Sequence, residues 1–99
     1  PLVCVNVMRG GPSTGLATRV SQGDILQSKN PSHGDYKSIT LCAGNLAECY
    51  TEVVRAFNIA DRFMQPVIVL LDETLGHMHG KADIPSAEDV EAGIVKRKR

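Results

Sequence analysis

The sequence has no excess of either charge and no long hydrophobic run. Because 11 basic residues balance 11 acidic ones, bulk charge gives no support for a general affinity for nucleic acid or an anionic membrane. The longest apolar runs, residues 2–5 and 66–71, are far shorter than the roughly 20 residues of a membrane-spanning helix. A signal peptide is not expected, because no basic segment precedes the first apolar run. We therefore expect neither a nucleic-acid partner nor a membrane partner.

Metal-binding patterns are also missing. Cys4, Cys42 and Cys49 show no CxxC or cysteine–histidine spacing, so a zinc or iron–sulfur site formed by this chain alone is not expected. Their neighbours are apolar, and we interpret all three as buried, reduced thiols, which fits the cytoplasm. His77 and His79 form a His-x-His pair that could chelate a metal. No carboxylate or cysteine stands at a helpful spacing, so loop or interface histidines are the favoured interpretation.

Apolar segments follow one another in an order that predicts an α/β fold. Residues 2–8 (LVCVNVM) read as a strand covered on both faces, with Asn6 as the polar exception. Residues 38–42 and 67–71 read as two further strands, separated by a helix over residues 46–64. A strand, a helix and a strand with a tight turn make a right-handed crossover between parallel strands. The predicted class is therefore α/β with a parallel sheet.

The helix over residues 46–64 is the clearest of these elements. Its apolar residues recur at helical spacing and are expected to form one face; they are Leu46, Tyr50, Val53, Val54, Phe57, Ala60, Phe63 and Met64. Asn45 is expected to cap the first turn with its side-chain oxygen, and Glu48 to reach back toward it. Pro66 is expected to end the helix, since the residue before a proline avoids the helical region.

Other segments carry weaker signals. Residues 20–28 are compatible with a short helix, and residues 76–99 with an extended arm. We interpret the basic end of that arm, Lys96–Arg99, as a solvated continuation or a subunit contact. Asp72 and Glu73 follow the third strand at the sheet edge where ligands gather in open α/β folds. Helix capping or solvation is the favoured interpretation for these two carboxylates, with ligand binding as the alternative.

The loop after the first strand is the candidate binding site. Glycines allow a ligand to approach the backbone closely, and hydroxyls with exposed N–H groups can line an anion pocket. Arg9 adds a planar donor fork that suits a carboxylate. The candidate substrate-binding residues are Arg9, Gly10, Gly11, Ser13, Thr14 and Gly15. The pattern fits a plain Gly-Gly-Pro turn equally well, and it is neither a P-loop nor a GxGxxG motif.

Seven segments, spread in one order over most of residues 1–80, carry a family likeness. They are Pro1–Val3, Arg9–Thr18 (RGGPSTGLAT), Gly23–Gln27, His33–Asp35, Cys49–Phe57, Pro66–Glu73 and Leu75–His77. Together they resemble the α subunit of the thiamine-diphosphate-dependent 2-oxoacid:ferredoxin oxidoreductases. The loop and the third strand end most resemble the 2-oxoglutarate type. The family usually has proline at the position of Ala17 and often alanine at that of Gly23, and these differences cast little doubt on the likeness.

The resemblance implies a fold and a reaction. In the family, the α subunit contains a pyrimidine-binding domain of the thiamine-diphosphate fold, and a β subunit binds the diphosphate and Mg²⁺. The complex oxidatively decarboxylates a 2-oxoacid to an acyl-CoA and passes electrons through iron–sulfur clusters on partner chains to ferredoxin. The arginine that opens this loop grips the substrate carboxylate, and that role carries over to Arg9.

The resemblance also implies an incomplete active site. Residues 1–80 would be the C-terminal portion of the pyrimidine-binding domain, and residues 81–99 an arm towards a following segment. The family's glutamate that activates the aminopyrimidine and its Tyr-Pro-Ile-Thr-Pro loop are expected upstream. We therefore assign no catalytic residue and expect the chain alone to be inactive. The competing hypothesis is a non-catalytic α/β module that binds an anion or serves in assembly.

Overall fold

The computed structural model describes residues 1–97 and contains three strands and four helices in that range. In chain order they are β1 (Leu2–Val7), α1 (Ile25–Lys29), β2 (Ile39–Cys42), α2 (Leu46–Phe63), β3 (Pro66–Leu71), α3 (Glu73–His77) and α4 (Ala87–Gly93). The predicted strands and the long helix are confirmed within two residues at each end. Lys98 and Arg99, half of the predicted basic end, lie outside the described residues.

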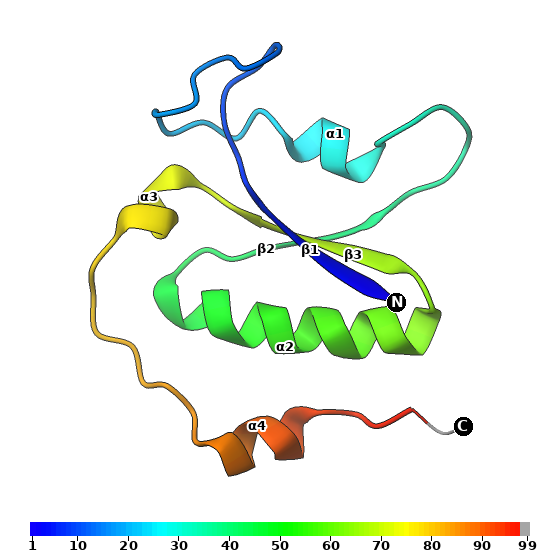
Figure 1. Cartoon of the computed structure of the whole chain (residues 1–99), viewed down its shortest axis with the longest axis vertical. Helices are drawn as coiled ribbons and strands as arrows, with labels where there is room; N and C mark the ends of the chain where they lie inside the picture. The colour runs from blue at the N-terminus through cyan, green and yellow to red at the C-terminus, as the bar shows by residue number, and fades with distance from the viewer. Residues whose placement is uncertain (98–99) are drawn as a thin grey trace.

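The three strands form one parallel sheet in the order β1-β3-β2. Val69 at the middle of β3 pairs with Val5 of β1 on one side and with Leu41 of β2 on the other. The β2–α2–β3 segment is the predicted crossover, and α2 runs along one face of the sheet while α1 lies across the other (Figure 1). The predicted α/β class with a parallel sheet is therefore confirmed.

The core lies between α2 and the centre of the sheet. Val67 and Val69 of β3 are fully buried, and Ala56 and Ala60 of α2 meet them with at most 1% of their surface exposed. Partly buried apolar residues complete this cluster; they are Val3, Ile39, Leu41 and Ile59. Because alanine is small, the helix axis comes close to β3, and packing of this kind is sensitive to single methylene groups.

The face of α2 that meets the sheet differs from the predicted one. Phe57, Phe63 and Met64 were expected to be buried, but they are 59%, 54% and 56% exposed. Ala60 of the predicted face does pack against the sheet, and Ala56, which was not among the predicted residues, packs beside it. Apolar residues occupy more than one side of this helix, and periodicity does not reveal which side packs most closely.

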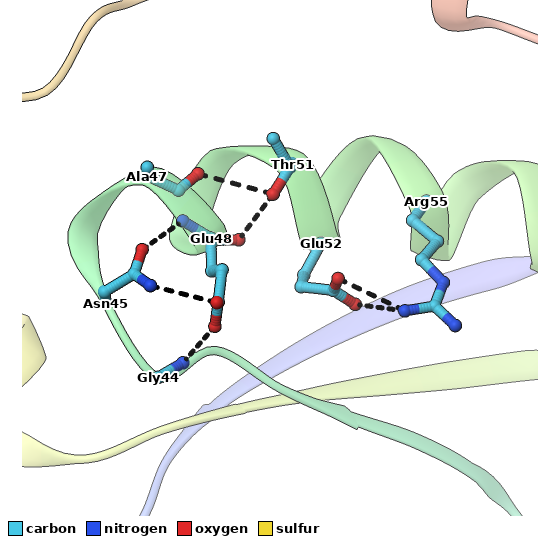
Figure 2. Close-up of polar contacts among 7 residues, drawn as sticks. All are labelled: Gly44, Asn45, Ala47, Glu48, Thr51, Glu52 and Arg55. Carbon is cyan, nitrogen blue, oxygen red and sulfur yellow. Dashed lines mark hydrogen bonds and ion pairs between the residues drawn. The ribbon is translucent and has the colours of Figure 1, made fainter.

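The two ends of α2 follow the sequence signals. Asn45 Oδ1 accepts a hydrogen bond from the Glu48 N–H at 2.9 Å, and Glu48 reaches back to Asn45 Nδ2 at 2.9 Å and to the Gly44 N–H at 2.7 Å (Figure 2). The first of these contacts satisfies an N–H donor that the first helical turn leaves free, and the other two hold the capping residues in place. Met64 ends the helix in the left-handed region (φ 53°), and Pro66 opens β3.

Two expectations about burial are wrong in the described structure. β1 is an edge strand of the sheet and is not covered on both faces, since Leu2, Val5 and Val7 are each more than half exposed. The three cysteines are free but not buried, since Cys4 and Cys42 are exposed and Cys49 is partly exposed. Cys4 and Cys42 belong to edge strands, and apolar sequence neighbours do not reveal which strand is central.

The segment after β3 contains more helix than predicted. Asp72 caps α3 by accepting the Leu75 N–H at 2.9 Å, which confirms capping as the favoured interpretation of that carboxylate. Ser86 and Asp89 form a capping box at the start of α4, so residues 87–93 are helical rather than extended. The Ser-x-x-Asp spacing was the available signal. None of the helices in residues 1–97 is long and apolar enough to cross a membrane.

The tight contact between α2 and β3 generates a prediction. Ala60→Leu should lower the free energy of unfolding by about 1–3 kcal/mol, because a larger side chain has no space against Val67 and Val69. Ala47→Leu on the exposed side of the same helix is the matched control and should change it by less than about 0.5 kcal/mol. Urea unfolding of both variants measures this, and equal midpoints would contradict the packing.

Candidate functional site

The candidate loop begins where β1 is anchored to β3. The Met8 N–H donates to the Leu71 carbonyl at 2.7 Å, which extends the strand pairing up to the residue before Arg9. Met8 itself is 2% exposed. The sheet therefore fixes the point from which the loop leaves.

Residues 10–16 close into a compact turn. The Leu16 N–H donates to the Gly10 carbonyl at 3.0 Å, and these two residues form an isolated antiparallel bridge. Gly15 has a φ of +53°, and a Cβ at this position would overlap the Gly10 carbonyl oxygen. Only glycine fits such a conformation and close approach without strain. The glycine pattern of the loop therefore has a structural role at Gly15.

A second contact holds the loop on its other side. Asp24 Oδ2 accepts the Arg9 N–H at 3.2 Å and the Asn6 side-chain amide at 3.2 Å. The Gly23 N–H donates to the Arg9 carbonyl at 3.2 Å, and a Cβ at Gly23 would come within 2.5 Å of that oxygen. Residues 23–24 precede α1 directly, so the loop leaves β1 at Arg9 and returns to the same residue before the helix begins.

A cavity of about 540 Å³ opens beside Arg9. Its lining residues come from β1, from β3 and from the region of α1; they are Cys4, Asn6, Val7, Arg9, Gln27, Ser28, Pro31, Pro66 and Ile68. Side chains alternate between the two faces of a strand. Val3 and Val67 face α2, so Cys4, Asn6 and Ile68 face the opposite side, where α1 lies (Figure 1). The cavity thus combines apolar walls with a guanidinium and polar groups.

The structure separates Arg9 from the other five predicted site residues. Arg9 lines the cavity, and its side chain is exposed. Gly10 is buried in the turn. The other four, Gly11, Ser13, Thr14 and Gly15, are exposed and are not among the residues lining the cavity. Their substrate contacts stay a prediction.

Three polar residues of the cavity were not singled out as binding residues. Asn6 had a visible signal, because it interrupts an apolar strand. Gln27 and Ser28 carried no such signal in the sequence, because their approach to the sheet depends on how the loop between β1 and α1 folds. Within residues 1–97 the side chains of His, Cys, Asp and Glu form no group of three or more that could hold a metal ion, and this includes His77 and His79.

The chain matches the family described as pyruvate flavodoxin/ferredoxin oxidoreductase, thiamine-diphosphate-binding, over residues 1–99. It belongs to this family. Among its relatives are the 2-oxoglutarate synthase subunits KorA of Methanothermobacter marburgensis and Archaeoglobus fulgidus. The first is 48% identical over 91% of this chain and 24% of its own length, and the second 47% identical over 93% and 27%. The chain thus spans about a quarter of the curated relatives that it matches.

A solved structure agrees with this assignment. It is the 2-oxoglutarate:ferredoxin oxidoreductase from Magnetococcus marinus with 2-oxoglutarate, coenzyme A and succinyl-CoA bound. The likeness has a TM-score of 0.72 at 40% sequence identity and covers 76% of this chain and 13% of that chain. The resemblance inferred from the loop and the downstream segments is confirmed.

The geometry of the turn predicts the effect of a single methyl group. Gly15→Ala should destabilise the loop by about 1 kcal/mol or more, because it forces a Cβ onto the Gly10 carbonyl. Trypsin cleavage after exposed Arg19 should then rise roughly fivefold, if cleavage follows the open population. Gly11→Ala is the control, because a Cβ there meets nothing within 4 Å. Equal cleavage rates, with the cut site identified by mass spectrometry, would argue against the closed turn.

Proposed function

We propose that this chain is part of the α subunit of a thiamine-diphosphate-dependent 2-oxoacid:ferredoxin oxidoreductase. The complex would oxidatively decarboxylate a 2-oxoacid, favouring 2-oxoglutarate, to an acyl-CoA and pass the electrons to ferredoxin. The observation that carries the proposal is Arg9, which lies two residues after the end of the parallel strand β1 and lines a cavity. Two KorA relatives named as 2-oxoglutarate synthase subunits support the choice of substrate.

The proposed role of Arg9 is to bind the substrate carboxylate. A guanidinium presents parallel N–H donors that match the two oxygens of a carboxylate, and it stays charged at any working pH. The polar groups of Asn6, Gln27 and Ser28 share the cavity with it, and they offer further hydrogen bonds to an oxygen-rich acid. Ser13, Thr14 and the loop glycines would form the outer wall when the substrate is bound.

The cofactor belongs to the assembled enzyme in this proposal. The described residues form no cluster of acidic, histidine or cysteine side chains for a metal. As the family resemblance implies, we assign Mg²⁺ and the diphosphate to the β subunit and the iron–sulfur clusters to partner chains. Thiamine diphosphate supplies the stabilisation of negative charge at the carbon that loses carbon dioxide. This chain's contribution is to orient the acid and to cover one side of the site.

The first test uses the assembled complex. Arg9→Lys should raise the KM for 2-oxoglutarate roughly tenfold, because a single ammonium replaces a two-pronged donor in a charge-assisted contact. Arg19→Lys, an exposed arginine of the same loop region, is the matched control and should leave KM unchanged. A dye-reduction assay over a panel of 2-oxoacids measures both variants. An unaltered KM in the Arg9 variant would remove this residue from the site and favour a non-catalytic anion-binding module.

The second test concerns the chain by itself. The purified chain should not turn over 2-oxoglutarate in the presence of thiamine diphosphate, Mg²⁺, CoA and an electron-accepting dye. The physical reason is that the groups proposed to hold and activate the cofactor are on other parts of the complex. Acyl-CoA formation followed by chromatography measures this, and turnover above the protein-free rate would contradict the proposed division between subunits.

A further inference from the structure

Asn6 is a polar residue in an apolar strand, and its partner is 18 positions away. Its side-chain amide donates to Asp24 Oδ2 at 3.2 Å, and both residues are partly buried. Partly buried polar groups are expected to be paired, because an unpaired donor or acceptor away from water is unfavourable. The pair therefore stabilises a defined position of the Asp24 carboxylate next to the end of β1.

The same carboxylate fixes the main chain of Arg9. Asp24 Oδ2 accepts the Arg9 N–H, and the neighbouring Gly23 N–H donates to the Arg9 carbonyl, each at 3.2 Å. Both peptide units that flank the Arg9 Cα are thus held. Because the positions of N, Cα and C determine the direction of the Cα–Cβ bond, these contacts set the direction in which the side chain leaves the backbone.

The hydrogen bond from the Arg9 backbone N–H to Asp24 leaves the Arg9 guanidinium available for a ligand. Within residues 1–97 the recorded ion pair joins Arg55 to Glu52, and none joins Asp24 to the Arg9 guanidinium. A carboxylate beside an arginine would ordinarily compete with a substrate acid for the guanidinium donors. Here Asp24 holds Arg9 through the backbone N–H, and Arg9 is among the residues that line the cavity.

We infer that Asp24, oriented by Asn6, is a positioning residue that directs the Arg9 guanidinium into the cavity. The inference rests on the proposed function, since it concerns the aim of the carboxylate-binding group. The geometry requires an acceptor oxygen at the position of Asp24 Oδ2, and the negative charge is secondary. Charge and position can therefore be separated by substitution.

The test compares two conservative variants in the assembled oxidoreductase. Asp24→Asn keeps an acceptor oxygen at the same distance from the backbone and should raise the KM for 2-oxoglutarate less than about twofold. Asp24→Glu keeps the charge but moves the carboxylate by one methylene group, and it should raise KM roughly tenfold with kcat little changed, as expected for the loss of a charged hydrogen bond. Asp83→Ala, an exposed carboxylate between α3 and α4, is the control for charge removal.

A double-mutant cycle tests whether Asp24 acts through Arg9. If it does, the double variant Asp24→Glu/Arg9→Lys should raise KM over the unaltered enzyme by much less than the product of the two single effects. A purely additive result would show that Asp24 affects the enzyme by another route and would overturn the inference.

Hydrogen exchange gives a readout that is independent of activity. The Arg9 amide should exchange several-fold faster in Asp24→Glu than in Asp24→Asn, because only the latter retains its acceptor. Unchanged exchange and an unchanged KM in Asp24→Glu, beside a raised KM in Arg9→Lys, overturn the positioning role alone. If neither Asp24→Glu nor Arg9→Lys alters KM, the proposed function fails and the inference falls with it.

Discussion

The burial of β3 between two parallel neighbours is the constraint on which the rest of the structure depends. Val67 and Val69 are fully buried under α2. The carbonyls at the end of β3 accept the N–H groups of Met8 at 2.7 Å and Ala43 at 3.3 Å, so all three strands end along one edge of the sheet. Arg9 follows Met8 directly, and its location is therefore set by apolar packing that lies on the other side of the sheet.

Local signals explain why much of the fold was predictable. The capping residues Asn45 and Glu48 indicate where α2 begins. The apolar strands on either side of this helix favour a crossover between parallel strands. The side of α2 that packs was only partly predictable, because Phe57 and Ala56 are neighbours in sequence and both are apolar. Where the helix comes close to the sheet, the smaller residue packs against it. This preference depends on tertiary packing and cannot be read from the helix sequence.

The sequence singled out Arg9, which lines the cavity, but it did not single out the polar residues around it. The glycine-rich loop after a strand fits a binding site and a plain turn equally well, and the family resemblance implies a carboxylate as the ligand. The contacts that hold Arg9 come from Asn6 and Asp24, which are separated by 18 positions. No periodicity or motif joins residues across such an irregular loop. The polar Asn6 in an apolar strand was the one available sign, and its partner could be recognised only in three dimensions.

A carboxylate next to the proposed site for an organic acid presents an electrostatic problem, because like charges repel in a partly buried region. The arrangement at Asp24 reduces it. One oxygen faces two N–H donors, from Asn6 and from the Arg9 backbone, and their dipoles oppose the negative charge. The Arg9 guanidinium is drawn into no ion pair by this carboxylate. Asp24 can therefore hold the loop through the Arg9 backbone N–H while the Arg9 guanidinium stays available. A side-chain salt bridge between the two residues would instead occupy the guanidinium.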